Sequence, residues 1–203
     1  MGRSAHDTMV RNITRAFRKA TPAHLAAGMG WYAEAYRVAA QIWPERPDLA
    51  AGVIAALSPR CQWSTNQLWA RVLITAARTG QACPAVHTTA MRAQAWRIAN
   101  GEAPLSVLNG PKVRSFWANI MGDTEAVTCD VWAVYVALGR KDDRMVSTQK
   151  RYDTVVAAYR RAAVILGVTP REVQAATWVA ARGVKPTDAG FHAASAAALA
   201  VAA

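Results

Sequence analysis

The sequence has few cysteines, and they are widely spaced. Cys61, Cys83 and Cys129 form no C-x-x-C pair, and no neighbouring histidine completes the ligand set of a zinc or iron–sulfur site. An odd number of isolated cysteines is typical of buried or free thiols in a reducing compartment. We therefore expect neither a metal nor a cofactor in this protein.

Long apolar runs are absent as well. No uncharged stretch reaches the roughly 20 residues that a membrane-spanning helix needs, and the N-terminus carries no apolar segment of the kind found in signal peptides. These two absences predict a cytoplasmic protein without a membrane partner.

Acidic residues are scarce. The 203 residues include 13 Asp and Glu against 24 Lys and Arg, which gives a formal net charge of +11 at pH 7 and a sequence pI near 10.3. Such an excess of positive charge favours a polyanionic partner, nucleic acid before membrane. A basic surface that serves only solubility is the simpler alternative.

No segment shows the sustained alternation of a β-strand, and no long internal repeat occurs. With 53% hydrophobic residues the chain can bury a substantial core, so we predict an all-α fold, either one domain over residues 1–203 or two small lobes sharing a cleft. Helical spacing and capping signals predict helices over residues 7–19, 22–43 with an interruption around Gly28 to Gly30, 49–57, 64–78, 87–98, 112–121, 148–166, from Pro170 onward and in an Ala-rich tail at 193–203.

The predicted helix at 7–19 is basic. It carries Arg11, Arg15, Arg18 and Lys19, a row of charges suited to lie on phosphates. A solvated helix face is an equally simple interpretation of the same row.

The most informative stretch is residues 105–132. Asn109, Gly110 and Pro111 break an apolar run and predict a tight turn that opens a helix. The free N–H groups at such a helix start attract anions, and Lys112 and Arg114 add positive charge there, so a phosphate is the expected ligand. Further along, Asp130 stands where a short extended segment enters the next helix.

A second candidate surface is the polar loop at residues 59–66, between two apolar helices. It combines a cation, amides and a large aromatic side chain, namely Arg60, Gln62, Asn66 and Trp63. Loops of this composition often carry binding contacts, although a simple connector fits the sequence equally well.

Residues 105–132 resemble the helix-hairpin-helix signature of the DNA glycosylase superfamily that includes endonuclease III. The resemblance rests on the Gly-containing turn, the segment from Val127 to Asp130 before the next helix and the separation of Lys112 from Asp130, and it extends over about residues 48–182. The second hairpin glycine, a proline before Asp130 and the iron–sulfur cysteines are missing. The chain is also similar to small proteins of actinobacterial phages that share S-P…W…N, G-x-K and D-x-W elements, which implies the cytoplasm of a bacterial host.

The resemblance implies a two-lobed glycosylase-like fold and roles for particular residues. Asp130 would stabilise the sugar cation or activate a nucleophile, and Lys112 would form a Schiff base in a lyase reaction. Arg60 or Gln62 would fill the gap left by a flipped base, and Trp63 or Trp132 would line its pocket. Asn109, Gly110 and Arg114 would contact the DNA backbone, and Asn66 belongs to the same contact loop.

Simpler roles stay open for the two catalytic candidates. Asp130 is also a common helix N-cap residue, and Lys112 also suits a phosphate contact. The alternatives to base excision are a non-catalytic phage protein that binds DNA or a host protein, and a base-modifying transferase that acts on modified thymine.

Overall fold

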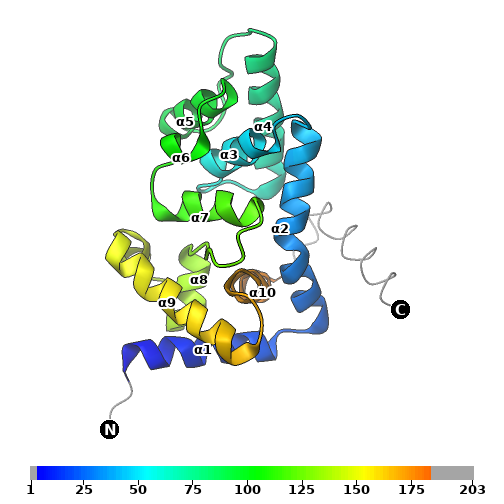
Figure 1. The fold of residues 1–203 in the computed structure, drawn as a ribbon. Coiled ribbons are helices and arrows are strands. Elements are labelled where there is room, and N and C mark those ends of the chain that lie inside the picture. Colours follow the sequence, from blue (N-terminus) through cyan, green and yellow to red (C-terminus); the bar gives the residue numbers. More distant parts are fainter. Residues whose placement is uncertain (1–3, 184–203) are drawn as a thin grey trace, which may run out of the picture. The chain divides into compact units, whose positions relative to one another are not determined.

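The structure, a computed structural model, describes residues 4–183. Within these residues every regular element is helical, as the sequence predicts (Figure 1). The elements are α1 (Ala5–Lys19), α2 (Pro22–Ile42), α3 (Pro47–Leu57), α4 (Trp63–Arg78), α5 (Thr89–Ala99), α6 (Pro104–Val107), α7 (Pro111–Ile120), α8 (Val131–Leu138), the 3-10 helix η1 (Asp143–Val146), α9 (Gln149–Leu166) and α10 (Pro170–Arg182). The Ala-rich helix predicted at 193–203 lies outside the described residues. No described helix combines the length with the apolar composition that crossing a bilayer requires.

The chain forms two compact units. Unit 1 combines the N-terminal residues up to Trp31 with the residues from Asp123 onward, and unit 2 is the intervening segment Tyr32–Gly122. Helix α2 therefore begins in unit 1 and ends in unit 2.

Unit 1 has a core that α1, α8, α9 and α10 share. Met9 and Ile13 of α1 are buried there with Tyr159 of α9 and Val173 of α10. The sequence predicts the starts of two of these helices correctly. The Thr148 side chain caps α9, and Thr169 and Glu172 form a reciprocal capping box at the start of α10.

Unit 2 is arranged around α3, which contacts α4, α5, α6 and α7. Every residue of α3 from Leu49 to Leu57 is buried, as its apolar composition predicts. Gly52 makes one of these contacts feasible, because a Cβ atom there would lie only 2.7 Å from Pro104 Cγ. The close approach fixes α6, and α6 leads directly into the turn at Gly110.

Two predicted helix starts are displaced. Helix α4 begins at Trp63 rather than at Ser64 or Thr65, because the Asn66 N–H already donates to Gln62 O at 2.8 Å. Helix α5 begins at Thr89 rather than at residue 87, because His87 has a φ of +55°, which an α-helix excludes.

The predicted interruption of α2 is wrong. The helix runs unbroken from Pro22 to Ile42, and Gly28 is buried within it. An ideal Cβ at Gly28 would lie 2.3 Å from Ala176 Cα, so this glycine lets the backbones of α2 and α10 approach closely. Gly30 is exposed, and a Cβ atom there would have open space around it to 4 Å. Gly28 thus serves helix packing and does not end the helix.

We predict that Gly28→Ala destabilises unit 1, because the added methyl group meets backbone that cannot move aside. The expected loss in the free energy of unfolding is about 1–3 kcal/mol or more, measured by urea denaturation. Gly30→Ala is the control and should raise the free energy of unfolding by up to about 1 kcal/mol through helix propensity. Equal effects of the two substitutions would contradict the packing role of Gly28.

Candidate functional site

The turn predicted before α7 is present in unit 2. Gly110 is the N-cap residue of α7, with a φ of +90° that residues other than glycine rarely adopt, and Pro111 occupies the first helical position. Asn109 and Gly110 are exposed, and open space surrounds the Gly110 Cα on the side where a Cβ would be. A ligand can therefore approach the backbone of this turn closely.

Arg114 holds the turn together. Its Nη1 donates to Leu105 O at 2.9 Å and to Leu108 O at 3.3 Å, which satisfies carbonyl groups at the end of α6. The guanidinium remains exposed, and its Nε and Nη2 make no hydrogen bond to another described residue. Arg114 can thus stabilise the turn and still offer N–H donors and charge to an anion.

Helix α7 is fixed to the core of unit 2 next to this turn. The Trp117 Nε1–H donates to Asp48 O at 3.0 Å, at the beginning of α3. The Asp48 carboxylate in turn binds Arg46 through two hydrogen bonds, and the Arg46 guanidinium holds the pKa of that carboxyl below its usual value. The turn at Gly110 is therefore presented from a rigid support.

Arg60 lies at the tip of a second turn, between α3 and α4 of the same unit. Its side chain is exposed and its φ is +57°. The His87 ring fixes this turn, since Nε2 lies 2.8 Å from Pro59 O and Nδ1 accepts from the Thr88 N–H at 2.7 Å. A carbonyl oxygen only accepts, so the ring proton is assigned to Nε2. The backbone that carries Arg60 is thus held in place by a residue distant in the chain.

The other candidates in this loop differ in exposure. Gln62 is exposed, and Trp63 is half-buried at the first position of α4. Asn66 is only 2% exposed, and its Nδ2 donates to Ile54 O at 3.0 Å. In this structure Asn66 ties α4 to the end of α3, whereas Arg60 and Gln62 face solvent.

Asp130 lies in unit 1, directly before α8. Its Oδ1 accepts hydrogen bonds from the backbone N–H groups of Trp132 and Ala133, at 2.9 and 3.0 Å. Its Oδ2 accepts from the Trp178 Nε1–H of α10 at 3.0 Å. The carboxylate is half-buried. The helix N-cap interpretation of Asp130 is therefore realised, and the same three donors leave the carboxylate in one fixed orientation.

Two tyrosines of α9 position the chain on either side of Asp130. The Tyr152 O–H donates to Val127 O at 2.6 Å, and the Cys129 N–H donates to Tyr152 Oη at 3.0 Å. After Asp130, the Tyr159 O–H donates to Ala133 O at 3.1 Å. Burial raises the pKa of the Tyr159 hydroxyl well above its ordinary value, so this group stays a hydrogen-bond donor.

Aromatic and cationic side chains lie on α8, in the loop that follows it and on α10. Lys141 Nζ sits 4.0 Å from the centroid of the Trp132 ring, and Trp132 meets Tyr135 edge to face. The Trp178 ring has Arg182 at 4.6 Å from its centroid. Trp132 is one of the predicted base-pocket residues, and it is half-buried.

Sequence reasoning does not single out Trp178 or Tyr152 as site residues. Each lies in a predicted helix, at 148–166 or from Pro170 onward, and helical spacing does not reveal which donor a ring presents to a distant segment. No local signal connects Trp178 to Asp130, since 48 residues separate them.

The two catalytic candidates belong to different units. Lys112 is half-buried at the second position of α7 in unit 2, and Asp130 is in unit 1. The cleft predicted to contain both residues stays a prediction.

Two of the three cysteines, Cys61 and Cys129, resemble structural thiols, whereas Cys83 is exposed. Cys129 is buried, and burial together with the Asp130 charge raises the pKa of its thiol well above the usual value. Burial also raises the pKa of Cys61. Within residues 4–183 no three His, Cys, Asp or Glu side chains gather in a group that could hold a metal ion.

We predict that Tyr152→Phe destabilises unit 1 by about 1–3 kcal/mol, because two buried hydrogen bonds to the segment before Asp130 are lost. Thermal or urea unfolding measures the change. Tyr135→Phe is the control, since Tyr135 is 40% exposed, and it should change the free energy of unfolding by less than about 0.5 kcal/mol. A Tyr152→Phe protein as stable as the control would show that the Tyr152 hydroxyl does not hold this segment.

Comparison with known proteins gives a family and no named activity. No curated protein sequence matches the chain, and no solved structure matches it. One family model matches residues 2–185, nearly the whole sequence, and its description is "Family of unknown function (DUF7178)". The chain thus belongs to the DUF7178 family.

Proposed function

We propose that this protein binds DNA and removes or processes a base, in the manner of the DNA glycosylases that residues 105–132 resemble. The observation that carries the proposal is the half-buried Asp130 carboxylate, which three N–H donors hold in a fixed orientation at the start of α8. A preorganised negative charge is what the chemistry of base release requires.

The proposed role of Asp130 follows from the charge that develops in the reaction. Breaking the N-glycosidic bond leaves positive charge on the sugar ring. A carboxylate beside the anomeric carbon stabilises that charge, or removes a proton from the attacking water. The Trp132 and Ala133 amides and the Trp178 indole fix Asp130 before the substrate arrives, so the carboxylate needs little reorganisation during the reaction.

DNA binding is assigned to the two exposed turns of unit 2. The turn at Gly110 offers an open backbone, the Asn109 side chain and the remaining donors of Arg114 to a phosphate. The turn at Arg60 offers a cation on a backbone fixed by His87, together with exposed Gln62. An exposed side chain on a rigid turn suits insertion into a base stack, which an enzyme acting on a flipped base requires.

Non-catalytic DNA binding is the second candidate function, and one observation favours it. Both oxygens of Asp130 already accept hydrogen bonds, which is sufficient for a residue that only caps α8 and anchors α10. A protein of this kind would use the same basic turns and would release no base.

We predict that Asp130→Asn lowers base release by about 10²- to 10⁴-fold and leaves DNA affinity within about twofold. Asparagine caps a helix as well as aspartate does, so the fold should persist, with the loss of about 1 kcal/mol from the Trp178 contact. The assay incubates the protein with duplexes that carry a panel of damaged or modified bases and scores abasic sites.

Asp123→Asn is the matched control for this assay. Asp123 is seven positions earlier in the chain, and its carboxylate accepts from the Glu125 and Ala126 N–H groups, so the substitution makes the same change of charge near a similar turn. Base release by the Asp130→Asn protein at the rate of the control would refute catalysis. If the wild-type protein binds the duplexes and releases no base from the panel, non-catalytic binding is favoured instead.

We also predict that Lys112 supplies the amine of any lyase step. Borohydride should then trap a covalent adduct between the wild-type protein and an abasic duplex, and Lys112→Ala should abolish that adduct. Lys150→Ala, at an exposed lysine of α9, should leave it unchanged. An adduct that survives Lys112→Ala would leave Lys112 as a phosphate-contacting residue.

A further inference from the structure

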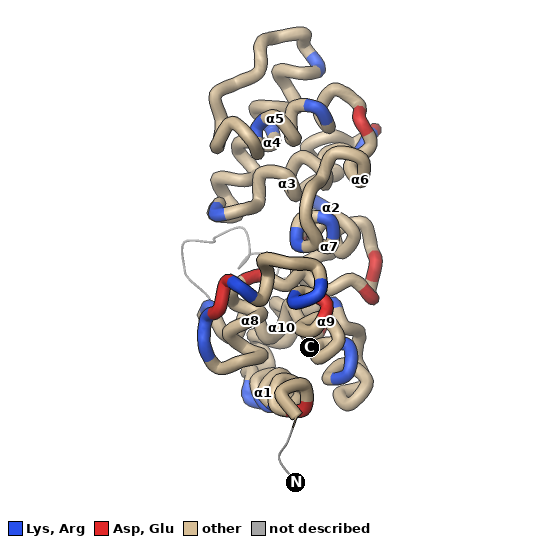
Figure 2. Tube along the Cα trace, turned by 90° about the vertical axis from the view of Figure 1, so that its left-hand side faces the viewer, with Lys and Arg blue, Asp and Glu red and all other residues tan. Residues whose placement is uncertain are grey.

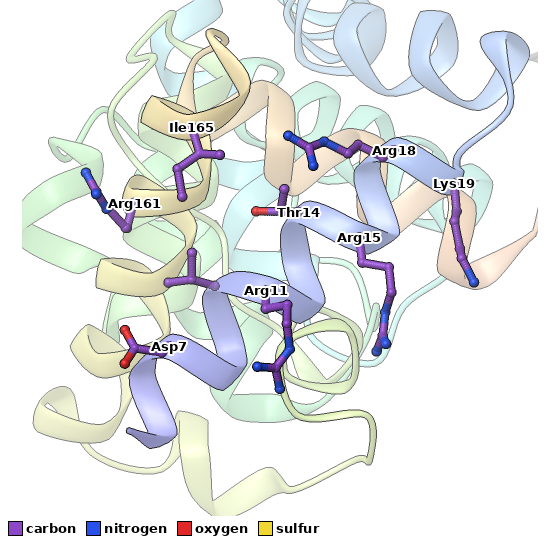
Figure 3. Close-up of a pocket in the computed structure, with 9 residues that line it drawn as sticks. Asp7, Arg11, Thr14, Arg15, Arg18, Lys19, Arg161 and Ile165 are labelled. Atoms are coloured by element: carbon purple, nitrogen blue, oxygen red, sulfur yellow. The ribbon is translucent and has the colours of Figure 1, made fainter. Parts of the chain in front are cut away.

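Unit 1 contains a cavity that the proposed function does not use. It lies between α1 and α9 and has a volume of about 590 Å³, which is the size of a small-ligand site (Figure 3). Its lining includes five cations, namely Arg11, Arg15, Arg18, Lys19 and Arg161. Figure 2 shows that Lys and Arg recur over the helices and that Asp and Glu are fewer.

These five cations lack carboxylate partners among the described residues. Arg46, Arg97 and Arg144 elsewhere in the chain each pair with a nearby Asp or Glu, at 2.9, 2.6 and 2.9 Å. The single acid at the cavity, Asp7, accepts a hydrogen bond from the Ser4 hydroxyl at 2.8 Å and pairs with none of the five. Clustered like charges without counterions repel one another, and a bound anion would relieve that repulsion.

Thr14 provides a second and independent indication of a ligand. Its side chain lines the cavity and is only 8% exposed, and its Oγ1 finds no hydrogen-bond partner within residues 4–183. A helical threonine usually donates to the carbonyl oxygen one turn earlier, and a buried hydroxyl without a partner is unfavourable. In Figure 3 Thr14 lies beside Ile165 of α9, with Arg161 and Arg18 on opposite sides of the pair. The hydroxyl is thus an unsatisfied donor in the wall of the cavity, and an anion that displaces the side chains over it would satisfy it.

The arrangement of the cations indicates an extended anion. Arg11, Arg15 and Lys19 are four residues apart, so they follow one face of α1 with a rise of about 6 Å per step. Val10 and Ile165 add apolar surface beside this row. One free phosphate would use only part of such a row, whereas a sugar–phosphate strand presents successive charges and apolar sugar surfaces to it.

We propose that the cavity between α1 and α9 is a phosphate-binding groove for a nucleic-acid strand. Thr14 Oγ1 donates to a phosphate oxygen, Arg18 and Arg161 neutralise that phosphate, and Arg11, Arg15 and Lys19 contact its neighbours along the strand. The inference rests on the proposed function only in taking DNA as the partner, because the groove needs no catalysis by Asp130.

The first test compares two double variants by fluorescence anisotropy with an unmodified labelled oligonucleotide over a range of salt concentrations. Arg18→Gln with Arg161→Gln should weaken binding about tenfold or more at low salt and reduce the slope of log affinity against log salt by about 0.7 to 0.9, because the two side chains together neutralise one phosphate. Lys150→Gln with Arg151→Gln removes the same charge from exposed positions of α9 that do not line the cavity. Equal losses for the two double variants would overturn the groove and leave only an effect of net charge.

Thr14→Val tests the buried hydroxyl with no change of charge and little change of size. Binding should weaken about threefold to tenfold, in line with the loss of one hydrogen bond, with an unchanged salt slope and with unfolding no easier than in the wild-type protein. A merely structural threonine would instead alter unfolding and leave binding as it was. Unchanged affinity of the Thr14→Val protein would overturn the assigned donor.

Two further measurements separate the sources of phosphate and the two proposals. In the first, pyrophosphate is titrated in competition with the oligonucleotide. The double substitution of Arg18 and Arg161 could weaken the binding of pyrophosphate and leave the binding of the oligonucleotide unchanged. That result would overturn a strand as the occupant. Base release is measured separately, and the Lys150→Gln, Arg151→Gln control, whose substitutions lie outside the cavity lining, should release bases at the wild-type rate. A failure of base release in all proteins would refute the excision proposal and leave the groove supported by its binding data.

Discussion

The hydrogen bonds of the Asp130 carboxylate connect helices that form the centre of unit 1. One oxygen caps α8 and the other anchors the Trp178 ring of α10, while Tyr152 and Tyr159 of α9 fix the chain just before and just after Asp130. Because these groups are buried or half-buried, each unmade hydrogen bond would cost the desolvation of a polar group. The same constraint that stabilises the packing therefore produces a rigidly oriented carboxylate, which is a requirement for catalysis as well as for a structural cap.

Close contact between helices is the second constraint. Gly28 brings α2 against α10, the helix that carries Trp178, and Gly52 brings α3 against Pro104, just before the turn at Gly110. Neither glycine breaks its helix. The absence of a side chain at Gly28 and at Gly52 thus determines where Trp178 and the turn at Gly110 are placed. The candidate functional groups therefore depend on two residues that make no proposed ligand contact.

The positive charge of the chain is large, and its cations fall into two groups, those that pair with acids and those that do not. Several arginines pair with acids, whereas those at the cavity between α1 and α9 pair with no described acid. Arg114 donates one N–H group to the turn that it stabilises and exposes its other donors to solvent. Cations on rigid elements give a protein affinity for polyanions when their charge is not neutralised internally. The proposal of DNA binding therefore has two kinds of support, from the turns of unit 2 and from the groove of unit 1, and chemistry at a base depends on Asp130 in particular.

The sequence by itself determined the elements whose causes are local. Helical periodicity and the absence of strand alternation predict the all-α class, the Thr169 and Glu172 pattern predicts the start of α10, and Gly110 with Pro111 predicts the turn before α7. Asp130 is also recognisable as a residue between an extended segment and a helix. Tertiary structure alone decided that Gly28 continues α2, that Asn66 is buried, that Trp178 and Tyr152 hold the Asp130 segment, and that Thr14 faces a cationic cavity with no described partner for its hydroxyl. Each of these depends on a contact between residues distant in the chain, and spacing within one helix carries no information about which distant group will meet it.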